Sequence, residues 1–147
     1  MDMAKVVSVN ISDTKGVVKK PVDEVVLREG VGVEGDAHSG PWHRQVSLLG
    51  MESIEIMRGQ GLDVGPGDFA ENITTQGLVL YELPVGTRLK VGPALLEVTQ
   101  IGKKCHTGCA IFQQVGKCIM PTQGIFARVL KGGVVRAGDK VEVLKEG

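Results

Sequence analysis

The residues best suited to chemistry lie in one segment, IGKKCHTGCAIFQQVGKCIMPTQGIFARVLKGG at 101–133. This segment holds every cysteine of the chain: Cys105, Cys109 and Cys118. Cys105 follows Lys103 and Lys104 and precedes His106, and nearby cations stabilise a thiolate relative to the thiol. A thiolate can act as a nucleophile, carry a persulfide or bind a soft metal. We therefore predict that Cys105 is reactive, with one of the other cysteines as a resolving thiol.

Two alternatives stay open for these cysteines. Cys105, His106, Cys109 and Cys118 are ligand types that zinc prefers, although adjacent ligands and a single returning cysteine depart from the paired spacing of most zinc sites. The second alternative is that a cysteine behaves as a small buried hydrophobe. The sequence favours this for Cys109, which precedes the apolar run AIF, but not for Cys105.

A second polar segment, GVGVEGDAHSGPWHRQVSLL at 30–49, ends in an apolar run that predicts a strand. Two histidines, His38 and His43, with an acid and an arginine in one glycine-rich loop indicate a site. Here Asp36 is expected to orient His38, and Arg44 to pair with Asp36 or hold an anion.

A third segment, GPGDFAENITTQGL at 65–78, matches neither a P-loop nor a dinucleotide fingerprint, because it lacks their spacing and endings. Its Glu71 and Asn72 are either site residues or ordinary turn formers, and spacing alone leaves both interpretations open.

Charge is unevenly distributed along the chain. The formal net charge is zero, which argues against general nucleic-acid binding. However, residues 1–100 carry nine Lys or Arg against fourteen Asp or Glu, whereas residues 101–140 carry seven against one. The cysteine segment therefore lies in the basic part, which indicates either an anion site or a solvated charged face.

Composition predicts one ordinary globular domain over residues 1–147, with 42% hydrophobic and 23% charged residues. The start, MDMAKVVSVN, has no signal-peptide pattern, and no run approaches the roughly 18 apolar residues of a membrane span. Three clustered cysteines also make a poor disulfide framework. We expect a cytoplasmic protein without membrane contact.

Hydrophobic patterning predicts a mainly β fold, an antiparallel β-barrel with one or two short helices. Twenty-one glycines suit the bends of a closed sheet. A hairpin turn is expected at Gly92-Pro93 and a tight turn at Gly132-Gly133. The predicted elements are strands within 4–12, 23–29, 87–101 and 124–144, and a helix at 51–60.

Three motifs in this order make the chain resemble the MOSC domain, a family named for the C-terminal domain of molybdenum cofactor sulfurase. They are GVEGDAHSG at 32–40 followed by Arg44, FAENITTQGL at 69–78, and LEVTQIGKKCH at 96–106 running on to GIFARVLKGGVVRAGD at 124–139. The similarity extends from about residue 5 to residue 144. It implies a barrel-like β fold that handles sulfur or the molybdenum cofactor.

The resemblance also implies site residues. In members attached to larger enzymes, a cysteine near the end of the VT strand carries a persulfide or ligates molybdenum; Cys105 matches it best, and Cys118 is the second candidate. Because molybdopterin carries a phosphate, cations are expected around it. Candidate cofactor contacts are Arg44, Asn72, Lys103, Lys104, His106, Arg128 and Lys131, with Asp36 and His38 beside Cys105 as catalytic candidates.

The leading functional hypothesis is a molybdenum-cofactor-binding or sulfur-carrier domain that delivers sulfur or metal through Cys105 to a molybdoenzyme. It implies a sulfur-donating desulfurase and a recipient molybdoenzyme as partners. No pyridoxal phosphate is expected in this chain, because a desulfurase needs a larger domain with its own lysine. The alternatives are a small molybdenum-dependent reductase of N-hydroxylated substrates, which needs an electron-donor protein, and a structural zinc-binding or regulatory module.

Overall fold

The computed structural model describes residues 4–12, 18–37, 39–42, 44–61, 63–102 and 124–144. The elements are β1 (Ala4–Ile11), β2 (Lys20–Val22), β3 (Glu24–Arg28), β4 (Gly32–Val33), β5 (Val46–Gly50), α1 (Met51–Gly59), β6 (Ile73–Gln76), the 3-10 helix η1 (Leu80–Glu82), β7 (Arg88–Val91), β8 (Ala94–Ile101), β9 (Ile125–Lys131), β10 (Gly133–Arg136) and β11 (Lys140–Leu144).

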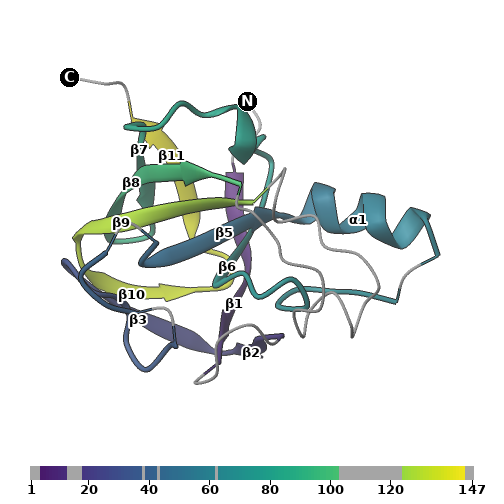
Figure 1. Cartoon of the computed structure of the whole chain (residues 1–147), viewed down its shortest axis with the longest axis horizontal. Helices are drawn as coiled ribbons and strands as arrows, with labels where there is room; N and C mark the ends of the chain where they lie inside the picture. The colour runs from purple at the N-terminus through teal and green to yellow at the C-terminus, as the bar shows by residue number, and fades with distance from the viewer. Residues whose placement is uncertain are drawn as a thin grey trace.

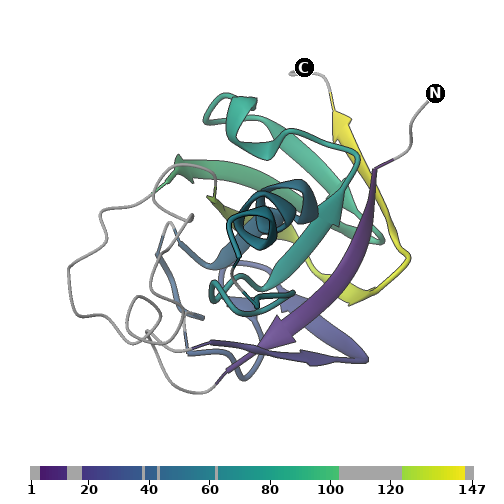
Figure 2. The ribbon, with the colours of Figure 1, turned by 90° about the vertical axis from the view of Figure 1, so that its right-hand side faces the viewer.

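Most of these strands form one closed barrel. Around it the order is β1-β6-β5-β9-β8-β7-β11, and β11 pairs with β1 to close the ring. Figure 1 shows α1 projecting from one side of this barrel, and Figure 2 shows β1 and β11 side by side near the two termini. Neighbouring strands are antiparallel except β5 and β6, which run parallel. The predicted mainly β barrel is therefore confirmed, with one parallel pair among its antiparallel ones.

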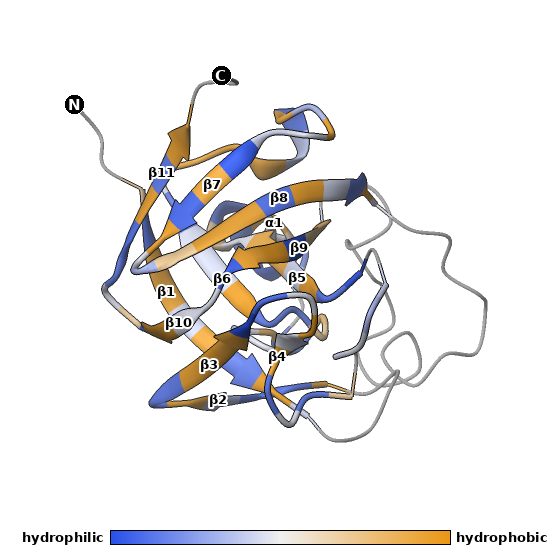
Figure 3. Cartoon of the chain, turned by 90° about the vertical axis from the view of Figure 1, so that its left-hand side faces the viewer, coloured by the Kyte–Doolittle hydropathy of each residue, from blue (hydrophilic) through white to orange (hydrophobic). Residues whose placement is uncertain are grey.

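Alternating side chains fill the barrel. Along β7, Leu89 and Val91 are fully buried whereas Arg88 and Lys90 are exposed, as expected for a strand with one face on a core. Figure 3 shows the same alternation of apolar and polar residues. The interior is built mainly from Val, Leu and Ile, because the chain has few aromatic residues.

A second apolar cluster lies between the barrel wall and α1. Strand β5 is buried on both faces: Val46 and Leu48 point into the barrel, and Leu49 belongs to the outer cluster. The helix covers this outer face with buried residues at helical spacing, as predicted for 51–60. The outer cluster consists of Leu49, Met51, Ile54, Met57, Val64, Phe69, Ala70 and Phe126.

The predicted hairpin at Gly92-Pro93 is confirmed. It joins β7 to β8, with Val91 opposite Ala94. Gly92 has φ +54°, and a positive φ at the first turn residue followed by the fixed negative φ of proline fits a type II′ turn.

The expected tight turn at Gly132-Gly133 is wrong. Strand β10 pairs with β3 rather than with the preceding β9, in a small separate sheet, β10-β3-β4. A side chain at Gly132 would collide with the Leu27 carbonyl oxygen, and one at Gly133 with Pro93. The glycines therefore permit close backbone approach where the chain leaves the barrel for the small sheet.

No helix in the described ranges is both long and apolar enough to cross a membrane.

Candidate functional site

Among the described residues, Arg44 is a predicted site residue in an unusual environment. Its guanidinium carbon lies 4.8 Å from the centre of the Trp42 ring and 5.6 Å from that of Phe126. Such stacking is favourable for a cation over aromatic rings. Within the part of the chain that the structure describes, the buried Arg44 Nε has no hydrogen-bond partner and the guanidinium makes no ion pair. Because a buried charged donor without an acceptor is costly, this guanidinium is suited to an anion.

Arg44 lies close to the root of the cysteine segment, that is, to the paired residues Ile101–Gly102 and Gly124–Ile125 that flank it. The last described residues before that segment pair with the first ones after it: Ile101 lies opposite Ile125, and Gly102 N donates to the Gly124 carbonyl at 2.7 Å. Both ends of the segment therefore leave the barrel at one place. Phe126, which contacts Arg44, follows directly.

Several predicted site residues lie outside the described residues. They are His38, His43, Lys103, Lys104, Cys105, His106, Cys109 and Cys118. Their roles, including the zinc alternative, stay predictions. Within the described ranges, no three His, Cys, Asp or Glu side chains are grouped so that they could hold a metal ion.

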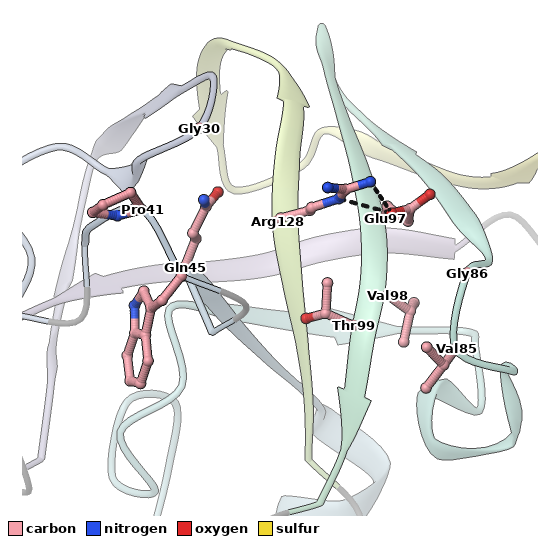
Figure 4. A pocket seen from close by; sticks show the side chains of 10 residues that line it. Gly30, Pro41, Gln45, Val85, Gly86, Glu97, Val98, Thr99 and Arg128 are labelled. Atoms are coloured by element: carbon pink, nitrogen blue, oxygen red, sulfur yellow. Dashed lines mark hydrogen bonds and ion pairs between the residues drawn. The ribbon is translucent and has the colours of Figure 1, made fainter.

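A cleft of about 590 Å³ opens on the outer face of the barrel (Figure 4). That volume falls within the range of about 300–1,000 Å³ typical of small-molecule sites. Trp42 lines the cleft and also stacks on Arg44, so the two features adjoin. The full lining is Gly30, Pro41, Trp42, Gln45, Val85, Gly86, Glu97, Val98, Thr99 and Arg128.

Arg128 lines this cleft and forms an ion pair with Glu97. Its Nη2 lies 2.6 Å from Glu97 Oε1, and its Nε donates to the same oxygen at 2.7 Å. Glu97 and Arg128 are opposite each other on β8 and β9, so the sheet register brings them together. Lys131, predicted with Arg128 as a phosphate contact, is exposed at the end of β9 and does not line the cleft.

Asp36 is held in the interior rather than in the cleft. Its Oδ1 lies 2.8 Å from Lys19 Nζ, and neither side chain is exposed. The same oxygen accepts a hydrogen bond from Ser12 N at 3.0 Å. No described contact joins Asp36 to Arg44, the pairing considered from the sequence. Lys19 was not predicted, because nothing in the Lys19-Lys20 pair shows that one of the two lysines is buried.

Asn72 links three strands of the barrel wall through its side-chain hydrogen bonds. Its Oδ1 accepts from Ser47 N at 3.0 Å and from Ser47 Oγ at 3.1 Å, and its Nδ2 donates to the Asn10 carbonyl at 3.3 Å. These bonds tie the start of β6, an element the sequence did not predict, to β5 and β1. Its contact to a cofactor stays a prediction.

Glu71, whose role the sequence did not decide, is completely buried. Its Oε2 accepts from Gly67 N at 3.0 Å and from Thr74 Oγ1 at 2.7 Å, whereas its buried Oε1 has no partner in the described ranges. Burial raises the pKa of this carboxyl to about 7, against the lowering effect of the hydrogen bonds. Near neutral pH, Glu71 is therefore present in both protonation states.

Comparison with known proteins decides the family. The model of the MOSC domain matches residues 35–142 of this chain. The chain belongs to the MOSC domain family. Among solved structures, the YuaD protein from Bacillus subtilis superposes on this MOSC domain with a TM-score of 0.75 and 23% identity, covering 99% of this chain and 97% of that one.

Two further structures share the fold of this MOSC domain. YiiM from Geobacillus stearothermophilus gives a TM-score of 0.72 at 22% identity, with 98% of this chain and 76% of that chain covered. YiiM from Escherichia coli gives 0.66 at 25% identity, with 99% and 71% covered. No curated protein matches the sequence. MOSC domains are associated with sulfur chemistry of the molybdenum cofactor, and this chain shares that association through its family.

Proposed function

We propose that this MOSC domain binds the molybdenum cofactor or its sulfur and passes sulfur or metal to a molybdoenzyme through Cys105, in the cytoplasm. The observation that carries the proposal is the guanidinium of Arg44. It lies between two aromatic rings, its Nε has no partner among the described residues, and it stands beside the root of the segment that holds all the cysteines.

The described residues fit such a group in two respects. An orphaned, partly buried guanidinium is a suitable donor for a phosphate, because charge-assisted hydrogen bonds are roughly twice as strong as neutral ones. The adjoining cleft is large enough for a ring system, and Trp42 forms part of its wall. Molybdopterin, when bound, would supply a molybdenum centre that accepts soft sulfur ligands.

In this proposal each residue has a separate task. Arg44 fixes the anionic end of the ligand, and the lysines that precede Cys105 keep its sulfur as the thiolate. The thiolate attacks the outer sulfur of a donor persulfide, the donor leaves as its own thiolate, and Cys105 then carries the transferred sulfur. A sulfur-donating desulfurase and a recipient molybdoenzyme are the partners that this sequence of steps needs.

Cys105→Ser should abolish cofactor and sulfur handling while leaving the fold intact, because serine lacks a nucleophilic sulfur. The test is to purify the protein from cells that make molybdenum cofactor and to measure bound molybdenum and pterin, together with intact mass before and after reduction. Wild type should carry molybdenum with pterin, or a reductant-labile mass increase of one sulfur atom. Cys109→Ser is the matched control and should retain both.

Stoichiometric zinc without either signal would overturn this proposal in favour of a zinc site at the cysteines. If Cys105→Ser binds as much molybdenum, pterin or sulfur as wild type, another residue must carry out the chemistry. Turnover of an N-hydroxylated substrate with an electron donor would instead favour the reductase alternative.

Arg44→Met should lower cofactor retention by about 10- to 100-fold, because it removes a charged hydrogen bond to the ligand. Methionine preserves much of the apolar contact with Trp42 and Phe126, so the melting temperature should change little. The measurement is molybdenum and pterin per protein after equal washing. Arg58→Met, on the exposed side of α1, is the control and should retain the wild-type content. Full retention in Arg44→Met would remove Arg44 from the site.

A further inference from the structure

The cleft contains one donor whose direction is fixed by the fold. Gln45 is only 4% exposed, and its Oε1 accepts a hydrogen bond from Val129 N at 2.9 Å. Because a backbone N–H can only donate, the amide oxygen must face β9 and the amide nitrogen must point the other way. Gln45 lines the cleft, and its Nε2 has no hydrogen-bond partner among the described residues.

The sheet explains why Gln45 is placed so accurately. Strand β5 stops pairing with β9 at Val46, which lies opposite Ala127. Beyond that point the Gln45 side chain takes over the Val129 N–H, and Gly30 N donates to the Val129 carbonyl at 3.1 Å. The glutamine therefore continues the ladder past the end of the strand, which leaves its NH₂ group pre-oriented at the cleft.

A second donor stands on the neighbouring strand. By register, Gln45 comes level with Arg128, and adjacent strands are about 5 Å apart. Figure 4 shows Gln45 beside β9 and the contact between Arg128 and Glu97. Only Nε and Nη2 of Arg128 bind Glu97, and the side chain is 52% exposed. The two donors can therefore serve the two oxygens of one ligand group.

The charge around the cleft favours an anion. Among the described residues, Glu97 is the only carboxylate in its lining. Arg128 pairs with Glu97 directly, Arg88 Nε lies 3.9 Å from it, and Arg44 stacks on Trp42 in the wall. The Glu97 carboxylate thus has two guanidiniums within 4 Å, and the third, that of Arg44, contacts the cleft wall through Trp42. The remaining wall is apolar, with Pro41, Trp42 and Val85, which suits a flat ring.

We propose that this cleft binds a small planar ring compound through its carboxylate, with one oxygen accepting from Gln45 Nε2 and the other from Arg128. The cleft is the same one whose size suits the ring system of the cofactor, so the two ligands would compete for it, but binding of the carboxylate itself needs neither sulfur nor molybdenum. The affinity of a small probe is expected to be weak, because few atoms contribute contacts.

The test compares two probes of almost the same shape, benzoate and benzamide, by ligand-observed NMR titration of the full chain. Benzoate should bind about tenfold more tightly, because its hydrogen bonds to the two donors are charge-assisted. Gln45→Glu keeps an oxygen for Val129 N–H but replaces the donor with a second acceptor, so benzoate affinity should fall at least about tenfold. Equal affinities for the two probes, or unchanged benzoate binding in Gln45→Glu, would overturn the proposal.

A matched pair of surface variants keeps the test decisive if Gln45→Glu does not fold. Val85 and Val79 are both exposed, at 58% and 46%, but only Val85 lines the cleft. Val85→Asp should weaken benzoate binding by repulsion, whereas Val79→Asp should leave it unchanged. Equal effects of the two substitutions would place the bound benzoate elsewhere and reject the cleft. Because neither sulfur nor molybdenum is needed, failure here is separate from failure of the proposed function.

Discussion

Asp36→Ala should lower the free energy of unfolding by about 3–5 kcal/mol, the usual effect of removing one partner of a buried ion pair. The reason is that Lys19 Nζ would stay in the interior without the carboxylate 2.8 Å away, where neither side chain is exposed. Ser12 N would also lose its acceptor. Urea unfolding measured by circular dichroism gives the change directly.

Two controls test whether the loss of stability comes from leaving a buried charge without a partner. Glu24→Ala breaks a surface ion pair with Arg136, whose side chain is 62% exposed, and should change stability by no more than about 1 kcal/mol. The double substitution Lys19→Met with Asp36→Leu replaces the pair by apolar side chains and should recover most of the loss. A loss in Asp36→Ala no larger than that of Glu24→Ala would contradict the account of a buried pair.

This result bears on the prediction that Asp36 is catalytic. If Asp36 acts only through the fold, sulfur handling should follow the folded fraction in Asp36→Ala and return in the double variant. A folded double variant that has lost sulfur handling would support the catalytic prediction instead.

Raising the pH through the range from about 4.5 to about 7 should destabilise the wild-type protein by about 3 kcal/mol through Glu71 alone. Its pKa is raised from 4.5 to about 7 by burial, so in this range the folded state binds more protons than the unfolded state. The contribution of Glu71 to the free energy of unfolding is therefore largest below about pH 4.5, falls as the pH rises, and becomes constant above about pH 7.

Glu71→Gln should remove that pH dependence, since glutamine stays neutral while keeping an oxygen for Gly67 N and Thr74 Oγ1. Urea unfolding at several pH values, with the difference between variant and wild type plotted against pH, isolates this group. Glu55→Gln on the exposed face of α1 is the control and should leave the wild-type profile in place. A Glu71→Gln profile parallel to that of wild type would refute the raised pKa.

Much of this fold can be predicted from the sequence, because its signals are local. Alternation in RLKV indicates a strand with one buried face, and Gly92-Pro93 specifies its own turn. The spacing of Met51, Ile54 and Met57 likewise predicts the helix. The order of the three motifs was sufficient for the family, which the family match confirms.

Other features depend on contacts between distant parts of the chain. Strand β6 has no alternation to reveal it, because Ile73, Thr74 and Thr75 are all buried in a parallel pairing with β5. The Gly132-Gly133 pair has the local sequence of a turn. In the structure, however, both glycines are needed because Leu27 and Pro93 pack too closely to leave room for side chains.

The barrel class could be predicted from short-range periodicity, the family from three motifs in a set order, and the group of thiols in a basic segment from composition. The roles of the polar residues became visible only in the folded chain. It places Asp36 in an ion pair with Lys19, leaves Arg44 Nε between two rings with no acceptor among the described residues, and directs the Gln45 amide nitrogen toward a cleft. The physical reason is that burial and hydrogen-bond partners are set by register and close packing across the barrel, and neither is visible in the order of residues along the chain.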